Sequence, residues 1–352
     1  MTIRGDGDQP VKIAFRADAS HELGTGHVMR CRALARSLRR RGAEIVFFCR
    51  QLPEWLIEEL KSDGFRHVPL SNVGDEMEQL IDKLQQERGD LFDWLVVDHY
   101  GWDERQEYVA ASYVRQVMVI DDLANRRHYC HLLLDQNDVS LGEVRYHGLV
   151  PQTARLLLGS QYALLREEFA EARASLKRLD GRVRMLLVCF GGTDPTNETA
   201  KALKALDAKE FADLNVHVVI GRTHSRLDQI TAKCRPNPRI HLHIQTNRMA
   251  MLMAEADLAL CAGGTMTWER YCMGLPGIVI AVADNQIELA KKSQQIGVDW
   301  YLGESARVDT EMVCSALLEA INSPDRIRQG QLAAMARVDG LGTERVADIM
   351  FG

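Results

Sequence analysis

Short apolar runs alternate with amphipathic helical segments along most of the chain, and this alternation restricts the possible folds more than any other feature of the sequence. In the first half, strands are expected at 11–15, 44–49, 94–98, 116–121, 131–134 and 155–159. In the second half, strands are expected at 185–190, 215–220, 240–244, 258–261 and 277–281. Strands that alternate with helices in this way form parallel sheets covered by helices on both faces.

The two sets of strands predict two domains. The chain has 352 residues, about twice the length of a common domain. A charged stretch at 166–181 separates the two sets. We expect an α/β fold with two Rossmann-like, doubly wound domains facing a cleft: an N-terminal domain at 1–165, a linker helix at 166–181 and a C-terminal domain at 182–330. Residues 331–352 are expected to form a C-terminal helix.

Composition and charge exclude several classes of function. The net charge of −6 gives no general attraction to nucleic acid or to an anionic membrane. No run approaches the roughly 18 apolar residues of a membrane span, and the first residues lack the apolar core of a secretory signal. We therefore expect a cytoplasmic protein with no membrane or nucleic-acid partner. The eight cysteines lack metal-ligand spacing, which predicts reduced buried thiols and no metal.

The turn Gly24-Thr25-Gly26-His27 links the first expected strand to the first helix. A side chain at such a bend faces the crevice beyond the carboxyl end of the strand, where parallel sheets bind ligands. Because histidine titrates near neutral pH, His27 is a candidate general base; its alternative role is to pack at the start of the helix. Asp18 and Asp98, at strand ends, either contact a substrate or hold backbone amides, and both roles stay open.

The segment from Cys261 to Glu269 carries the main chemical signal of the second half. Gly263 and Gly264 let the backbone approach a ligand, and the helix that they open presents amides that favour a diphosphate. Thr265, or Thr267 in the same segment, can cap that helix or donate to phosphate oxygens. Glu269 suits two adjacent ribose hydroxyls, and its alternative role is to balance the helix dipole.

A second glycine loop follows the expected strand at 185–190 and contains Gly191, Gly192 and Thr193. It is placed to cover the same phosphates or a bound sugar. A nicotinamide dehydrogenase is disfavoured because Met29 replaces the third glycine of the dinucleotide motif. In addition, no acidic residue closes a second strand before Cys49.

The order strand, Gly-Gly, helix with a glutamate, Gly-x-Pro and Asn-Gln resembles the nucleotide-sugar half of the GT-B glycosyltransferases, including the GlcNAc transferase that makes lipid II. The chain from about residue 11 to about residue 300 also resembles a hydrolase family of pseudaminic acid biosynthesis, which acts on UDP-2,4-diacetamido-2,4,6-trideoxy-β-L-altropyranose. The motifs that carry this resemblance are Phe15-Arg16-Ala17-Asp18, Gly24-Thr25-Gly26-His27, Asp98-His99-Tyr100-Gly101, Asp121-Asp122, the segment 162–169 and Gly191-Gly192-Thr193-Asp194.

The resemblance implies that water attacks the anomeric carbon of a UDP-sugar with inversion and that UDP leaves, with no metal and no cofactor. The family's general base corresponds to His27, and its tyrosine corresponds to Tyr100, which positions the water or the sugar. Asn285 lies where family members contact the hexose, with Gln286 beside it as a further substrate-binding residue. The expected catalytic residues are thus His27, Tyr100 and Asn285, while Gly26 leaves room for the sugar ring.

Two other functions remain open. A GT-B glycosyltransferase with a UDP-HexNAc donor would use the same donor half, although the highly charged stretch 51–90 disfavours a lipid acceptor. A non-catalytic UDP-sugar-binding protein would keep the region around Glu269 and tolerate the loss of His27. The GT-B likeness also implies that the C-terminal helix at 331–352 packs back on the N-terminal domain. The sequence leaves the oligomeric state open, and a monomer is expected.

Overall fold

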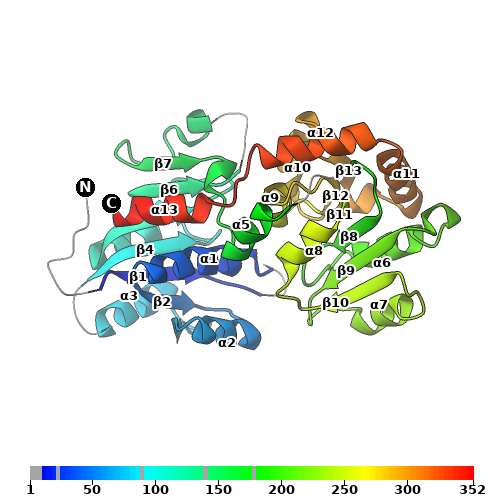
Figure 1. Cartoon of the computed structure of the whole chain (residues 1–352). Helices are drawn as coiled ribbons and strands as arrows, with labels where there is room; N and C mark the ends of the chain where they lie inside the picture. Colours follow the sequence, from blue (N-terminus) through cyan, green and yellow to red (C-terminus); the bar gives the residue numbers. More distant parts are fainter. Residues whose placement is uncertain (1–9, 21–23, 88–90, 138–141, 177–179) are drawn as a thin grey trace. The chain divides into compact units, whose positions relative to one another are not determined.

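The computed structural model describes residues 10–20, 24–87, 91–137, 142–176 and 180–352 (Figure 1). The chain forms two compact units, here called unit 1 (residues 1–166 and 341–352) and unit 2 (residues 167–340). The chain thus leaves unit 1 after Arg166 and returns to it at Leu341. Unit 2 ends at Gly340, ten residues after the predicted end of the second domain at 330.

Unit 1 contains a parallel sheet of seven strands in the order β3-β2-β1-β4-β5-β6-β7. The strands are β1 (Lys12–Ala17), β2 (Glu44–Cys49), β3 (Arg66–Pro69), β4 (Phe92–Asp98), β5 (Val114–Ile120), β6 (Leu132–Asp135) and β7 (Arg155–Leu158). Every strand predicted in the first half is present. The sequence missed β3, a short edge strand whose residues are only partly buried or exposed.

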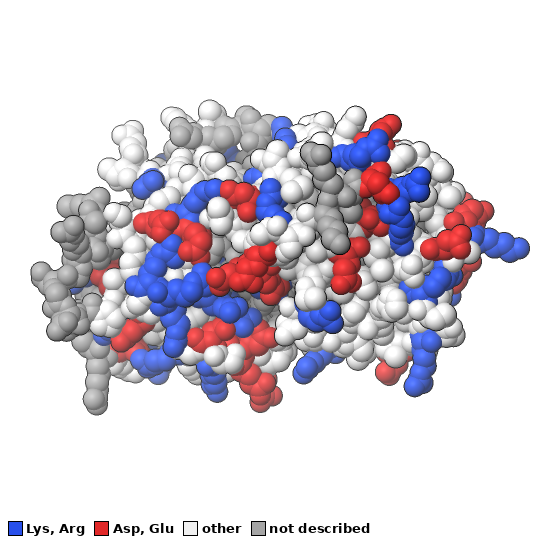
Figure 2. Space-filling model, viewed as in Figure 1, with Lys and Arg blue, Asp and Glu red and all other residues white. Residues whose placement is uncertain are grey.

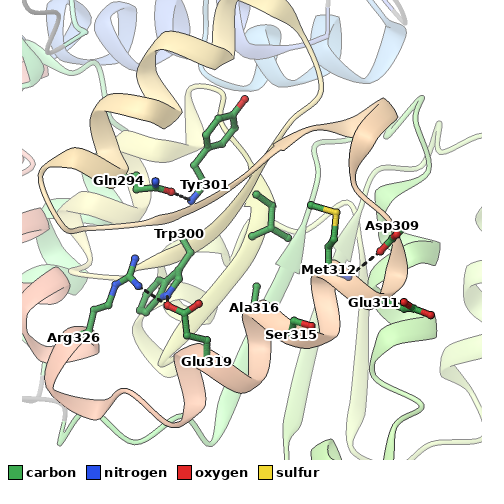
Figure 3. A pocket seen from close by; sticks show the side chains of 11 residues that line it. Gln294, Trp300, Tyr301, Asp309, Glu311, Met312, Ser315, Ala316, Glu319 and Arg326 are labelled. Atoms are coloured by element: carbon green, nitrogen blue, oxygen red, sulfur yellow. Dashed lines mark hydrogen bonds and ion pairs between the residues drawn. The ribbon is translucent and has the colours of Figure 1, made fainter.

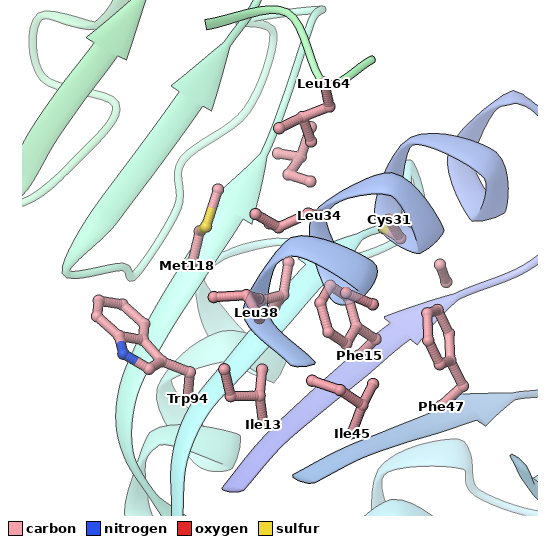
Figure 4. Close-up of a cluster of buried hydrophobic side chains, with 14 of the residues drawn as sticks. Ile13, Phe15, Cys31, Leu34, Leu38, Ile45, Phe47, Trp94, Met118 and Leu164 are labelled. Carbon is pink, nitrogen blue, oxygen red and sulfur yellow. The ribbon is translucent and has the colours of Figure 1, made fainter. Parts of the chain in front are cut away.

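The helices of unit 1 are α1 (Gly26–Arg40), α2 (Glu54–Ser62), α3 (Glu76–Gln86), α4 (Glu104–Ala110) and α13 (Gly342–Phe351). The apolar face of α1 packs on the sheet, where Leu34 and Leu38 meet Ile13 and Phe15 (Figure 4). Helix α13 lies against α1, and Met350 of α13 belongs to the same apolar cluster. The single C-terminal helix expected from residue 331 is wrong, because the chain breaks between α12 (Pro324–Met335) and α13.

Unit 2 contains a parallel sheet of six strands in the order β10-β9-β8-β11-β12-β13. The strands are β8 (Met185–Cys189), β9 (Asn215–Ile220), β10 (Ile240–Ile244), β11 (Leu258–Ala262), β12 (Gly277–Ala281) and β13 (Trp300–Glu304). All strands predicted in the second half are present. The sequence missed β13, an edge strand whose residues after Trp300 are only partly buried.

The helices of unit 2 are α5 (Glu167–Ala174), α6 (Glu198–Ala205), α7 (Leu227–Cys234), α8 (Met249–Glu255), α9 (Met266–Cys272), α10 (Ile287–Gln295), α11 (Thr310–Ile321) and α12. The expected linker helix is shorter than predicted and is part of unit 2 as α5. Arg173 of α5 donates hydrogen bonds to the carbonyl oxygens of Cys272 and Met335 at 2.6 and 2.9 Å. These bonds fasten α5 to the ends of α9 and α12.

Lys and Arg side chains alternate with Asp and Glu side chains over the visible surface (Figure 2). The arginines of α1 illustrate this pattern, since Arg32 pairs with Asp63 and Arg40 pairs with Glu344. The charge of these two arginines is therefore balanced by nearby carboxylates. In the part of the chain that the structure describes, no helix combines the length and apolar character needed to cross a membrane.

Candidate active site

The candidate catalytic group of unit 1 lies at the carboxyl ends of β1 and β4. These strands are neighbours in parallel register, with Ala17 opposite Asp98. The strand order reverses beside β1, so the connections after β1 and β4 leave the sheet in opposite directions, which is where parallel sheets of this kind bind ligands. His27 is the second residue of α1, Asp98 ends β4, and Tyr100 follows in the next loop. Residues far apart in the sequence thus meet at one edge of the sheet.

His27 is held by a buried carboxylate. Its Nδ1 lies 2.5 Å from Oδ1 of Asp98, and the side chains are 12% and 1% exposed. Among the described residues, no group hydrogen-bonds to Nε2 of His27. A carboxylate that accepts a hydrogen bond from Nδ1–H leaves the Nε2 lone pair available. This is the arrangement of a general base that is oriented by a carboxylate.

Arg30 of α1 also binds Asp98. Its Nε donates to Oδ2 at 2.6 Å, and its Nη2 donates to Oδ1 at 2.7 Å. Burial would raise the pKa of Asp98, but the charge of Arg30 and the hydrogen bonds from Arg30 and His27 hold that pKa well below its usual range. Asp98 is therefore a permanent carboxylate. The partners of this carboxylate named above are side chains, so the structure does not support the role of a backbone acceptor.

Tyr100 lies beside the imidazole of His27. The two rings meet edge to face, with their centroids 4.6 Å apart. Burial, together with the nearby charge and hydrogen bond of Asp122, raises the pKa of the Tyr100 phenol well above its usual range. The phenol therefore stays protonated near neutral pH, so it can donate a hydrogen bond but cannot serve as a base.

Asp18 is occupied by contacts within unit 1. Its Oδ1 accepts from the backbone amides of Arg50 and Gln51 at 2.7 and 3.0 Å, and its Oδ2 accepts from Arg16 at 2.7 Å. His99 Nε2 lies 3.4 Å from the same Oδ2 atom. These contacts favour the structural role for Asp18, which fixes the connection after β2 to the end of β1.

The turn before α1 has the conformation that its glycines predict. Gly24 has φ +72°, and its amide donates to the carbonyl oxygen of Ser20 at 2.9 Å. Gly26 is the first residue of α1. The side chain of Thr25 does not cap this helix. The turn residues 21–23 lie outside the described residues.

In unit 2, Gly263 and Gly264 connect the end of β11 to α9, as predicted. Gln286 holds this turn, because its Oε1 accepts from the amides of Gly263 and Val282, each at 3.1 Å. The sequence assigned Gln286 to the substrate, whereas the structure shows that its oxygen ties together the loops after β11 and β12. Its Nε2 lies toward Gly264, 3.7 Å from the position that a Cβ there would occupy.

The other predicted residues of this turn differ in exposure. Thr265 and Asn285 are exposed, and Glu269 is half-buried in α9. Thr267 is 2% exposed, so Thr265 is the threonine that a ligand can reach. Helix α9 has seven residues and no side-chain cap at its start. In this turn the amides of Thr267 and Trp268 donate to the carbonyl oxygens of Gly264 and Thr265 at 2.9 and 3.2 Å.

The second glycine loop lies at the same edge, since β8 and β11 are parallel neighbours. Gly191 has φ +91° and is exposed together with Gly192, while Thr193 is half-buried. Asp194 closes the loop, because its carboxylate accepts from the amides of Glu198 and Thr199 at 2.9 and 2.8 Å and caps α6. The two glycine loops thus follow neighbouring strands at the carboxyl edge of the sheet.

Two cavities lie outside the predicted residues. A cavity of about 670 Å³ in unit 2 is bordered by β13, α11 and α12 (Figure 3). There, Trp300 Nε1 donates to Glu319, and the guanidinium of Arg326 stacks 3.9 Å from the Trp300 ring. In unit 1, a cavity of about 350 Å³ is lined by His99, Gly101 and Trp102, on both sides of Tyr100 in the chain. Neither cavity contains His27, Asn285 or the glycine loops.

Sequence reasoning missed Arg30 as part of the site, and it quoted Asp122 only within a motif. Arg30 Nη1 donates to Asp122 Oδ2 at 3.2 Å, so the guanidinium joins Asp98 to Asp122. The available signal was spacing, because Arg30 follows His27 by three positions and therefore lies on the same face of α1. The many arginines of this helix concealed that signal.

Comparisons with known proteins support the fold and the nature of unit 2. A model of the Glycosyltransferase family 28 C-terminal domain matches residues 185–348, just under half of the chain. The spore coat polysaccharide biosynthesis protein SpsG of Bacillus subtilis is 27% identical and is aligned over 96% of this chain and 97% of its own length. The UDP-2,4-diacetamido-2,4,6-trideoxy-beta-L-altropyranose hydrolase of Campylobacter jejuni is 26% identical over 81% of this chain and 98% of that protein.

A shorter match joins the chain to an enzyme of another named activity. The UDP-N-acetylglucosamine--N-acetylmuramyl-(pentapeptide) pyrophosphoryl-undecaprenol N-acetylglucosamine transferase of Salinibacter ruber is 27% identical over 48% of this chain and 45% of that protein. Among solved structures, Acinetobacter baumannii MurG superimposes with a TM-score of 0.65 at 13% identity, over 97% of this chain and 99% of MurG. The chain therefore has the two-domain GT-B glycosyltransferase fold that its sequence predicts.

Proposed function

We propose that this protein is an enzyme of nucleotide-sugar metabolism that hydrolyses a UDP-linked 2,4-diacetamido-2,4,6-trideoxyhexose of the altrose type to the free sugar and UDP. The observation that carries the proposal is the His27–Asp98 pair, in which Nδ1 is bound and Nε2 has no hydrogen-bond partner among the described residues. The relative from C. jejuni, which is aligned over nearly its whole length, supports the choice of substrate.

The reaction breaks the bond between the anomeric carbon and the β-phosphate oxygen. As the water oxygen bonds to the anomeric carbon, Nε2 of His27 accepts a proton from that water. The electron pair of the broken bond goes to the phosphate oxygen of UDP. Direct displacement inverts the configuration at the anomeric carbon. Tyr100, which stays protonated, donates a hydrogen bond that positions the water or the sugar.

The proposal assigns the UDP moiety to unit 2. The amides after Gly264 and the hydroxyl of Thr265 bind the diphosphate, and the loop of Gly191, Gly192 and Thr193 covers it or the sugar. Glu269 accepts hydrogen bonds from the ribose hydroxyls. Asn285 and the Nε2 amide of Gln286 contact the hexose. Aligned amides stabilise the charge that develops on UDP, so the proposed reaction needs no metal ion.

A second candidate is a GT-B glycosyltransferase with a UDP-HexNAc donor. The match of residues 185–348 to the glycosyltransferase domain model favours it, as does the partial likeness to the transferase of S. ruber. The two candidates differ in what attacks the anomeric carbon. A hydrolase releases the free sugar with water alone, whereas a transferase requires an acceptor hydroxyl.

Hydrolysis in heavy-oxygen water separates these candidates. The purified protein is incubated with the UDP-linked diacetamido-trideoxyhexose without an acceptor, and both products are analysed by mass spectrometry. The proposal expects the label in the sugar and none in UDP. Label in the phosphate would show that a different bond breaks, and turnover only with an added acceptor would support the transferase.

Substitution of the proposed base tests its role. His27→Asn should retain UDP binding and lose turnover, because the amide cannot accept the proton of the attacking water. His147→Asn, at an exposed position of unit 1, is the matched control and should keep wild-type turnover. Normal turnover by His27→Asn would remove the base assignment.

A further inference from the structure

Arg30 competes with His27 for one carboxylate. The guanidinium is 4% exposed and forms two hydrogen bonds with Asp98, one of which ends on Oδ1, the same atom that contacts His27. Its remaining nitrogen, Nη1, reaches Asp122. A single buried cation therefore joins the two carboxylates that lie behind His27 and Tyr100.

The ionisable groups around the imidazole come from one strand, one helix and two loops. Asp98 ends β4, Arg30 and Cys31 belong to α1, and Tyr100 and Asp122 follow β4 and β5. Cys31 Sγ lies 3.6 Å from Asp98 Oδ2, and burial keeps this thiol neutral by raising its pKa. Because Tyr100 is neutral as well, two carboxylates face one guanidinium, and the group carries one net negative charge.

We propose that Arg30 is a positioning residue that keeps His27 in the neutral, Nδ1-protonated form by sharing the Asp98 carboxylate with it. A carboxylate without Arg30 would attract a second proton to the imidazole, and a doubly protonated His27 cannot accept a proton from water. The guanidinium opposes that second proton by its charge. It also holds Asp98 in the orientation that binds Nδ1. The catalytic meaning of this inference rests on the proposed function, whereas the effect on titration does not.

The proposal makes opposite predictions for two substitutions. Arg30→Gln removes the cation and should move the NMR titration of His27 to higher pH. Asp122→Asn removes an anion from the other side of Arg30 and should move that titration to lower pH. Arg30→Lys keeps the charge but not the paired hydrogen bonds, so it should restore the wild-type titration. If Arg30 only supported the fold, Arg30→Gln and Asp122→Asn would not shift the His27 titration in opposite directions.

The experiment measures histidine titration by NMR on the full chain without substrate. The His27 signal, one of eleven histidine signals, is assigned by its loss in His27→Asn. Arg32→Gln is the matched control, because Arg32 lies on the same helix but pairs with Glu59 and Asp63. This control should leave the titration of His27 unchanged. An unchanged titration in Arg30→Gln would overturn the proposal.

Further measurements distinguish a failed role of Arg30 from a folding defect and from a wrong proposed function. If Arg30→Gln fails to fold, an unshifted or raised pKa in Asp122→Asn overturns the proposal, and a lowered one supports it. Kinetics provide the second measurement. In Arg30→Gln, the acidic limb of the plot of kcat/KM against pH should move to higher pH together with the NMR titration. A shifted NMR titration in a protein without hydrolase activity would refute the proposed function alone. Hydrolysis that depends on His27, with no NMR shift in any variant, would refute the role of Arg30 alone.

Discussion

Replacement of Asp98 by asparagine tests the geometry of the site most directly. Asp98 Oδ1 accepts from His27 Nδ1 and Arg30 Nη2 at 2.5 and 2.7 Å, and Oδ2 accepts from Arg30 Nε at 2.6 Å. An amide has only one oxygen, so in either orientation its NH₂ group meets an N–H group of Arg30. When the amide nitrogen takes the place of Oδ1, it donates to Nδ1 and moves the imidazole proton to Nε2. His27 then cannot act as the base.

Asp98→Asn should lower both turnover and stability. General-base catalysis contributes about 10²- to 10⁴-fold, so turnover of Asp98→Asn should fall by that factor. Removal of one partner from a buried ion pair costs about 3 to 5 kcal/mol, and this full cost applies because Asp98 and Arg30 are 1% and 4% exposed. UDP affinity should be retained, because the proposed UDP contacts belong to unit 2.

The assay combines UDP release, calorimetric UDP binding and urea unfolding of the same preparations. Asp93→Asn is the matched control on the same strand, where Asp93 accepts from the amide of Lys12 at 2.8 Å near the other end of β4. Its turnover should equal that of the wild type. A folded Asp98→Asn variant whose turnover is within about tenfold of the wild type would refute the assignment of His27 and Asp98 as a base and its orienting acid.

Three further predictions concern stability and metal dependence. Burial would lower the pKa of His128, but Asp121 and Glu107 raise it to about 9. The stabilisation from the charged imidazole is therefore complete below pH 6.5 and is lost as the pH rises through 9. Unit 1 should lose about 3 kcal/mol of unfolding free energy over that range, a loss that His128→Gln should not show in urea titrations. Gly221→Ala would place a Cβ 2.5 Å from the carbonyl oxygen of Gly192 and should destabilise unit 2 by about 1 to 3 kcal/mol in thermal unfolding; Gly192→Ala, whose nearest contact is at 3.9 Å, should not. Treatment with a chelator should leave turnover unchanged, and activity restored only by a divalent cation would contradict the proposed chemistry.

The central strands were predictable because their apolar runs encode burial on both faces of a sheet. Strands β1, β4, β8 and β11 lie inside the sheets, where nearly every residue is buried. The two missed strands, β3 and β13, lie at sheet edges. Edge strands have fewer neighbours and tolerate polar side chains, so their sequences resemble those of loops. The break between α12 and α13 was also missed, although Gly340, which has φ +86°, lies in it.

The sequence by itself determined the sheet class, the turns that carry His27 and the glycine pair at 263–264, and the residue types available for the chemistry. These properties are local, since they depend on periodicity and on the backbone freedom of neighbouring residues. Only the tertiary structure decided which partner each side chain meets. His27 and Asp98 are 71 positions apart, and they meet because β1 pairs with β4. The same pairing places Arg30 on Asp98, a contact that no local pattern encodes.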